Sequence, residues 1–161
     1  MSEEITPEWA PGASTGFELG TDGPRVIMVG VDGSDSSWRA AAYAAGLARR
    51  QNALLTMVYV QPYMAMAGAY GADVQGVTEE IADDLVREIQ EHAERVKDVY
   101  TGRWTFLTRR GDAYTGLAEA ADELKADAVV VGASEKTGHR LIGSVAVRLV
   151  KAGRWPVTVV P

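Results

Sequence analysis

The chain contains no cysteine among its 161 residues, and this absence removes several kinds of chemistry at once. Disulfide bonds, thiolate metal sites and cysteine nucleophiles are all excluded. Histidine is nearly as scarce, since the sequence has two, and neither has a carboxylate partner at the spacing of a metal site or a catalytic triad. The composition therefore argues against a metal site built on cysteine or histidine and against a catalytic triad.

Long apolar runs and an excess of basic charge are also missing. No run approaches the ~20 residues that a membrane helix needs, and Glu3 and Glu4 stand where a signal peptide would carry Lys or Arg. The formal net charge of −6 argues against a general binder of nucleic acid or anionic membranes, because both depend on basic side chains that neutralise phosphate. We expect a cytoplasmic protein without nucleic-acid or membrane partners.

The sequence divides into a tail and one domain. Residues 1–23 are rich in Gly, Pro, Ser, Thr and Glu and show no periodicity, which predicts a flexible N-terminal tail. Residues 24–161 alternate strand signals with helical signals and are long enough for one hydrophobic core. No internal repeat or second domain is visible.

The alternation within the domain predicts five strands and four helices. Strands are expected at residues 26–31, 53–60, 103–108, 128–131 and 155–160, and helices at 36–50, 79–99, 113–125 and 145–152. Such alternation is typical of a parallel sheet with helices on both faces, so we predict an open, doubly wound five-stranded α/β sheet of order 3-2-1-4-5. Residues 61–77 interrupt the pattern and are either a lid over the strand ends or an untethered linker.

Two turns rich in Gly and Ser follow the first and fourth predicted strands. They are Asp32-Gly-Ser-Asp35 and Gly132-Ala-Ser-Glu135. A sheet of this order places both turns at the crevice where the strand order reverses, which is where such sheets bind ligands. The second turn leads to Gly143-Ser144-Val145 at a predicted helix start, where backbone N–H groups and the helix dipole favour phosphate. The convergence predicts an anion site.

Each of these residues also has a purely structural interpretation. Asp32 would contact a ribose or a metal that bridges phosphates, or else form a turn after the strand. Ser144 would donate to phosphate or cap the last helix, and Gly143 would admit a ligand or simply join loop to helix. Lys136 and His139 would add positive charge, although solvation is the commoner fate of such side chains.

Enzyme interpretations fit less well. The sequence has no Walker loop and no G-x-G-x-x-G motif. A phosphotransfer receiver needs an aspartate after the third strand, where Thr108-Arg-Arg110 stands, and an Asp-x-Asp phosphatase fails because Ser34 occupies the second aspartate position. A flavin phosphate held by Gly33-Ser-Asp-Ser-Ser37 stays open as an alternative. No residue stands out as a general base, so weak ATP hydrolysis is the most that we expect.

Five stretches of the domain, taken in order, are similar to a known family. They are Val-Gly-Val-Asp32-Gly-Ser, Leu-Thr-Met-Val-Tyr-Val60, Ala-Asp-Ala-Val-Val-Val-Gly132, Gly143-Ser144-Val145 and Trp-Pro-Val-Thr-Val-Val160. Together they resemble the universal stress protein family over residues 25–161. The resemblance implies a small stress-response protein, commonly a homodimer, from a family with ATP-binding and non-binding branches.

The resemblance also implies a nucleotide site. Asp32 would contact ribose, Val60 would meet adenine through its backbone, and Gly143-Ser144-Val145 would hold phosphate. The full implied set is Asp32, Gly33, Ser34, Val60, Gly132, Ala133, Ser134, Gly143, Ser144 and Val145. The implied ligand is ATP or another adenine nucleotide, with magnesium.

The phosphate loop departs from the pattern of the binding branch, which has the form G-x-x-G-x9-G-[S/T]. Gly132 matches the first glycine and Gly143-Ser144 the last pair, but Glu135 replaces the second glycine and the loop is two residues shorter. Both changes weaken triphosphate binding, since an inward carboxylate repels phosphate. We predict a universal-stress-type protein that binds an adenine nucleotide and acts through conformation or partners. The alternative is a homodimeric interaction module that binds no nucleotide.

The last predicted strand offers a surface for a second copy of the chain. Val157 and Val159 alternate with Thr158 at a sheet edge, where pairing with another strand would satisfy the backbone groups. The resemblance points the same way. We therefore predict a homodimer through residues 155–160, from Trp155 to Val160.

Overall fold

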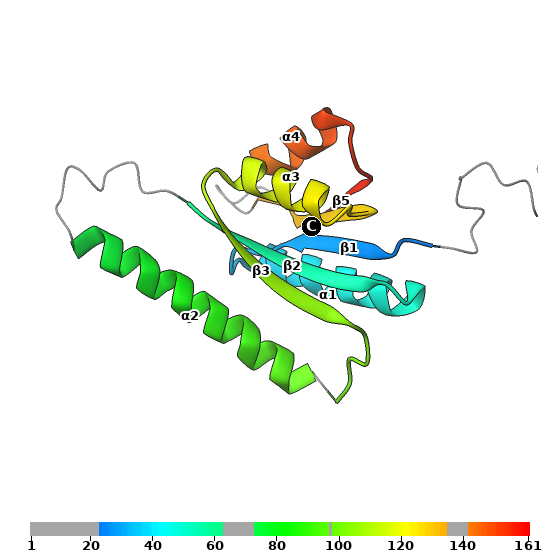
Figure 1. Cartoon of the computed structure of the whole chain (residues 1–161), viewed down its shortest axis with the longest axis horizontal. Helices are drawn as coiled ribbons and strands as arrows, with labels where there is room; N and C mark the ends of the chain where they lie inside the picture. The colour runs from blue at the N-terminus through cyan, green and yellow to red at the C-terminus, as the bar shows by residue number, and fades with distance from the viewer. Residues whose placement is uncertain (1–22, 63–72, 97, 135–141) are drawn as a thin grey trace, which may run out of the picture.

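A computed structural model of the chain describes residues 23–62, 73–96, 98–134 and 142–161. Within these residues, five strands alternate with four helices (Figure 1): β1 (Val26–Gly30), α1 (Asp35–Gln51), β2 (Leu54–Gln61), α2 (Asp73–Val96), β3 (Trp104–Arg110), α3 (Ala113–Glu123), β4 (Ala128–Gly132), α4 (Ser144–Ala152) and β5 (Val157–Val160). The predicted number and order of elements are confirmed. None of the described helices is long and apolar enough to cross a membrane.

The strands form one parallel sheet in the predicted order, β3-β2-β1-β4-β5. The central strand β1 pairs with β2 on one side and with β4 on the other, so that Ile27 lies between Leu55 and Ala128. The chain moves outward from β1 in one direction to β3 and then in the other to β5. The carboxyl ends of β1 and β4 therefore diverge into a crevice, as doubly wound sheets require.

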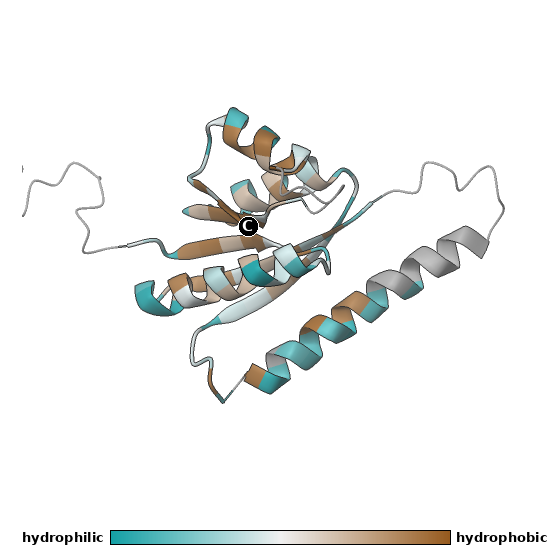
Figure 2. Cartoon of the chain, turned by 180° about the vertical axis from the view of Figure 1, so that it is seen from behind, coloured by the Kyte–Doolittle hydropathy of each residue, from teal (hydrophilic) through white to brown (hydrophobic). Residues whose placement is uncertain are grey.

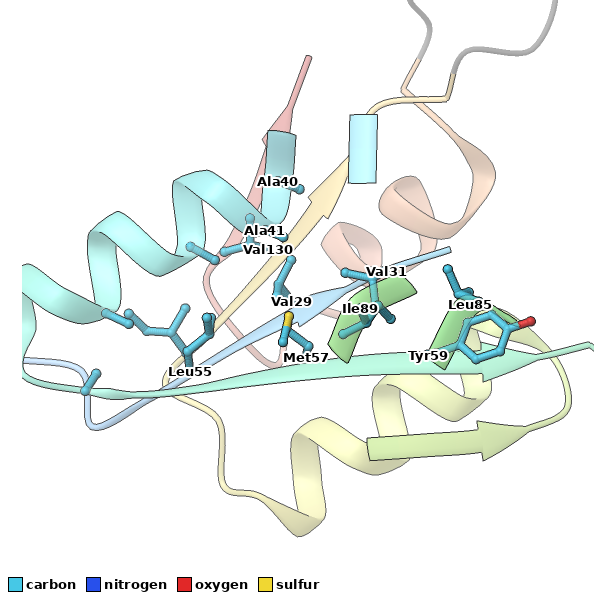
Figure 3. Close-up of a cluster of buried hydrophobic side chains, with 14 residues drawn as sticks. Val29, Val31, Ala40, Ala41, Leu55, Met57, Tyr59, Leu85, Ile89 and Val130 are labelled. Atoms are coloured by element: carbon cyan, nitrogen blue, oxygen red, sulfur yellow. The ribbon is translucent and has the colours of Figure 1, made fainter. Parts of the chain in front are cut away.

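Each face of the sheet has its own hydrophobic core. Side chains alternate along a strand, so Ile27 and Val29 face one core while Met28 faces the other. The first core lies under α1 and α2, and Figure 3 shows Ile89 of α2 reaching toward Val29 and Met57. The second core lies under α3 and α4, which lie together on the opposite side of the sheet in Figure 1.

Local sequence signals set the ends of several helices. The Ser34 side chain caps α1 by accepting a hydrogen bond from the backbone N–H of Ser37 at 3.2 Å. Asp112 caps α3 by accepting from the backbone N–H of Thr115 at 3.0 Å. The left-handed residue Asn52, with a φ of 53°, follows the end of α1. Ser34 is therefore the residue that caps the start of α1.

The largest boundary difference concerns α2. This helix was predicted at residues 79–99 but spans Asp73–Val96, and β2 extends to Gln61, so the prediction of one loop over residues 61–77 is wrong at both ends. Gly76 lies inside α2, where a glycine costs only about 1 kcal/mol, which a long helix tolerates. Residues 63–72, and with them the lid and linker interpretations, lie outside the described residues, as do residues 1–22 of the predicted tail.

The last strand is shorter than predicted. It begins at Val157 rather than at residue 155, and Pro156 precedes it. The Pro156 carbonyl still accepts a hydrogen bond from the backbone N–H of Val129 at 2.9 Å. Proline has no N–H to donate, and its position just before β5 leaves the hydrogen bonds of the strand itself intact. Both β3 and β5 are edge strands, as predicted.

Candidate functional site

A cleft of about 520 Å3 opens at the carboxyl ends of β1, β2 and β4. The turns after β1 and β4 form two of its walls, the start of α4 forms a third, and the end of β2 with the first turns of α3 forms the fourth. Every residue of the predicted nucleotide set except Gly33 lines this cleft. Gly33 has a φ of 84°, a left-handed conformation that favours glycine, so its place is in the turn itself.

Close packing between the end of β4 and the first turn of α1 brings the two predicted turns together. A Cβ atom at Gly132 would lie 2.6 Å from the carbonyl carbon of Ser36 and 2.8 Å from the nitrogen of Ser37. Both contacts are with backbone atoms, so only glycine fits. The juxtaposition predicted from the strand order therefore depends on a glycine that packs against α1.

Asp32 forms the turn that its structural interpretation predicted, and it also lines the cleft. Its Oδ1 atom accepts hydrogen bonds from the backbone N–H of Ser34 at 3.0 Å and from the Ser34 hydroxyl at 2.6 Å. Its own backbone N–H donates to the Ser37 hydroxyl at 3.3 Å. The side chain is exposed, and within the described part of the chain its Oδ2 atom makes no hydrogen bond. One carboxylate oxygen is thus left for another partner.

The N-terminus of α4 has no side-chain cap, in contrast to α1 and α3. Its N-cap residue is Gly143, with φ −64° and ψ 157°, and Ser144 is the first helical residue. Of the two roles predicted for Ser144, the helix cap is therefore wrong, because the cap position falls one residue earlier. Ser144, Val145 and Ala146 line the cleft, and the N–H groups of a first helical turn have no acceptor within the helix. This end of the cleft suits an anion.

A Cβ atom at Gly143 would lie 3.0 Å from the Cβ atom of Ser134, which follows β4. Glycine therefore permits the chain after β4 to approach the start of α4 closely. Three further residues that were given roles from the sequence lie outside the described residues: Glu135, Lys136 and His139.

One wall of the cleft was missed by the sequence analysis. Ala113 and Leu117 of α3 line the cleft beside Val60 of β2. A Cβ atom at Gly116 would lie 2.8 Å from both methyl carbons of Val60, so α3 packs directly on that residue. The available signal was topological: α3 starts after β3, at the same edge of the sheet as the two predicted turns.

Charged groups around the cleft hold its walls together. Arg148 of α4 pairs with Asp112 at 3.1 Å and lies 4.1 Å above the ring of Tyr114, which ties α4 to α3. Hydrogen bonds from Thr115 and the positive charge of Arg148 lower the pKa of Asp112.

Burial, and then the negative charge of Asp32, raise the pKa of Tyr59. No cluster of three or more potential metal ligands occurs among the described residues.

The model of the universal stress protein family matches residues 24–161. The chain belongs to the universal stress protein family. A universal stress protein of Methanocaldococcus jannaschii is 33% identical over 140 residues, which cover 83% of this chain and 80% of that protein. Membership confirms the resemblance deduced from the turns and strands.

Solved structures of the family share the fold. A crystal structure of a universal stress protein in complex with cAMP is 29% identical, with a TM-score of 0.65, and the match covers 86% of this chain and 97% of that one. A universal stress protein from Lactobacillus plantarum is 23% identical, with a TM-score of 0.72 and coverage of 85% and 97%. The second match supports the doubly wound fold alone.

Proposed function

We propose that this universal stress protein binds an adenine nucleotide in the cleft between β1 and β4 and acts through conformation or partners. The observation that carries the proposal is the uncapped start of α4, which faces the same cleft as the Asp32 carboxylate. The start of α4 suits a phosphate group, and the Asp32 carboxylate suits the hydroxyl groups of a ribose. The relative in complex with cAMP, at 29% identity, supports the choice of an adenine nucleotide.

The backbone of Val60 is available for the adenine ring. The β1–β2 ladder ends where Gly30 pairs with Val58, and the Val58 carbonyl accepts from the backbone N–H of Val31 at 2.9 Å. Residues two apart in a strand direct their N–H and C=O groups to the same side. Those of Val60 therefore point beyond the end of β1, into the crevice, where an adenine edge would pair with them.

The cleft favours a short phosphate chain. Asp32 is the one carboxylate among the described residues that line it, and the described residues hold no metal cluster, so magnesium would enter on the phosphates of the nucleotide. In the sequence, Glu135 replaces a glycine of the ATP-binding pattern and the loop is two residues shorter. We therefore expect AMP or cAMP to bind at least as tightly as ATP.

Calorimetric titration with ATP, AMP and cAMP in the presence of magnesium tests this proposal. We expect binding by the natural chain, and loss of binding in Gly143→Val, which places a side chain at the start of α4, and in Asp32→Ala. Asp35→Ala is the matched control, because Asp35 is the first residue of α1, directly after the same turn, but does not line the cleft. Absence of heat and of any melting shift with millimolar nucleotide would contradict the proposal.

The edge strand β5 supports a second proposal, a homodimer through residues 155–160. β5 pairs with β4 from Val157 to Val160, and no other described strand lies on its outer side. The carbonyls of Pro156 and Val160 accept from the β4 side, from Val129 and Ala133. Alternation then turns the N–H and C=O groups of Val157 and Val159 outward, toward a second copy.

Light scattering at micromolar concentration tests the dimer, and a monomeric mass would contradict it. The two proposals are tested independently. A dimeric mass without nucleotide binding would favour the interaction module over the nucleotide-binding protein.

A further inference from the structure

A second cavity lies between α1 and α2, on the face of the sheet away from α3 and α4. Its volume is about 420 Å3, which is within the usual range of small-molecule sites. The residues that line it lie between 38 and 49 in α1, at 55 and 57 in β2, from 89 to 96 in α2, and at 99, 100 and 104. We call this cavity the α1–α2 groove. It shares no lining residue with the nucleotide cleft.

The groove exists because small residues of α1 stand opposite α2. Ala42, Ala45 and Gly46 contribute little volume, and a Cβ atom at Gly46 would meet only Arg50 Nη1, at 3.4 Å. Among the described side chains of α2, Leu85 and Ile89 are the buried ones. Figure 2 shows α2 lying at an angle across this face, with polar and apolar bands along its described part.

Large apolar side chains around the groove stay in contact with solvent. Val96, Val99 and Trp104 line it with exposed fractions of 47%, 81% and 41%. Within the groove, the Trp38 and His92 rings stack with centroids 4.7 Å apart and an interplanar angle of 16°. An exposed apolar patch with a flat aromatic surface is typical of a binding site for an apolar or aromatic group.

The charges of the groove favour an anion. Arg49 lines it, and none of the described residues that line it carries a carboxylate, although the chain as a whole has a net charge of −6. Within the described part of the chain, the Arg49 guanidinium has no hydrogen-bond or ion-pair partner. Burial raises the pKa of Tyr100, which also lines the groove, and the positive charge of Arg49 partly opposes that rise. A guanidinium beside an apolar surface matches a carboxylate in both charge and geometry.

We propose that the α1–α2 groove binds a small aromatic or aliphatic carboxylic acid, with its apolar part against Trp38 and Trp104 and its carboxylate on Arg49. This site is independent of the nucleotide cleft.

Calorimetric titration of the full chain with 1-naphthoate tests the proposal, and 1-naphthalenemethanol serves as the uncharged counterpart. Arg49→Gln should weaken naphthoate binding about tenfold, because it removes a charge-assisted hydrogen bond, and should leave the binding of the alcohol unchanged. Arg50→Gln is the matched control, since Arg50 is the next residue of α1 and does not line the groove. Ala42→Phe, at an exposed position of the lining, should block both compounds.

Indole N–H signals in a heteronuclear NMR spectrum give a second readout. Those of Trp38 and Trp104 should shift on addition of naphthoate, whereas that of Trp155, which packs in the other core, should not. Circular dichroism and melting curves establish that each variant is folded.

Four results would overturn the proposal. They are no binding at millimolar naphthoate, equal affinity of Arg49→Gln and the natural chain, displacement of naphthoate by AMP, and a dimeric mass that Ala42→Phe reduces to a monomer. The third would place the compound in the nucleotide cleft, and the fourth would make the groove an interface between copies.

Discussion

A single methyl group at Gly132 should destabilise the protein and distort the nucleotide cleft. In Gly132→Ala the new Cβ atom would lie 2.6 Å, 2.7 Å and 2.8 Å from the carbonyl carbon and oxygen of Ser36 and the nitrogen of Ser37. All three are backbone atoms, so no side-chain rotation relieves the contact. Carbon atoms pack at about 3.5–4.0 Å, so β4 and α1 must separate by roughly 1 Å. Overpacking of this kind costs about 1–3 kcal/mol, so we expect a loss of about 2 kcal/mol for Gly132→Ala.

Urea unfolding followed by circular dichroism measures this cost. For a loss of about 2 kcal/mol and a slope of about 2 kcal/mol per molar urea, the midpoint should fall by about 1 M. The melting temperature of a chain of this size should fall by about 4–8 °C. Gly46→Ala is the matched control, because its Cβ atom would meet only Arg50 Nη1, at 3.4 Å, in the interior of α1. That variant should gain about 0.5–1 kcal/mol of stability.

The same substitution should change the free energy of unfolding in opposite directions at the two positions, lowering it at Gly132 and raising it at Gly46. A Gly132→Ala variant as stable as the natural chain would refute the close packing of β4 on α1. Equal losses in Gly132→Ala and Gly46→Ala would show that the contact at Ser36 is not the cause. The distortion should also weaken AMP binding, because Ser36 and Ser37 line the cleft.

Two other substitutions have effects that follow directly from hydrogen bonding. Asp112→Ala should cost about 1 kcal/mol in urea unfolding because it removes the cap of α3, whereas Asp112→Asn should keep most of that stability. The pKa of Asp112 in the folded protein is lowered from 3.8. The stability that the ionised Asp112 carboxylate contributes is therefore complete above pH 3.8 and is lost as the pH falls through the lower pKa of the folded protein. Urea unfolding at a series of pH values measures this loss. Thr56→Val should raise stability by about 1 kcal/mol in thermal melts, because the buried Thr56 hydroxyl has no partner among the described residues, and a loss would contradict this.

The fold was predictable from the sequence because its central strands are buried on both faces. Ile27, Met28 and Val29 are all fully buried, and such a strand must be a continuous apolar run, unlike the alternating pattern of a half-exposed strand. The start of α2 was not predictable by the same rule. Its first residues include Gly76 and follow a segment rich in glycine, so local propensity pointed to a loop while the helix in fact begins at Asp73.

The position of the site was predicted from the sequence, but the reason why glycine is needed at each position was predicted only in part. Gly132 and Gly143 were singled out as phosphate-loop glycines, and both lie at the cleft. The structure gives Gly132 a packing role against α1 and gives Gly143 a close approach to Ser134. A motif shows that glycine is present but not which neighbour excludes a side chain. Gly116 was missed because its partner, Val60, is distant in sequence and belongs to another element.

The α1–α2 groove was hidden from sequence analysis by the uniformity of α1, whose small residues lie on two faces of the helix. Ala40, Ala44 and Ala48 recur every four residues and are fully buried, as close packing of a helix on a sheet requires. Ala42, Ala45 and Gly46 lie on a second face, where the same small volume leaves space that α2 does not fill. Periodicity cannot distinguish the two faces, because alanine is compatible with both. The distinction depends on what stands opposite, and here it is Trp38, Trp104 and Arg49, whose guanidinium has no partner within the described part of the chain. These groups favour a ligand rather than solvent.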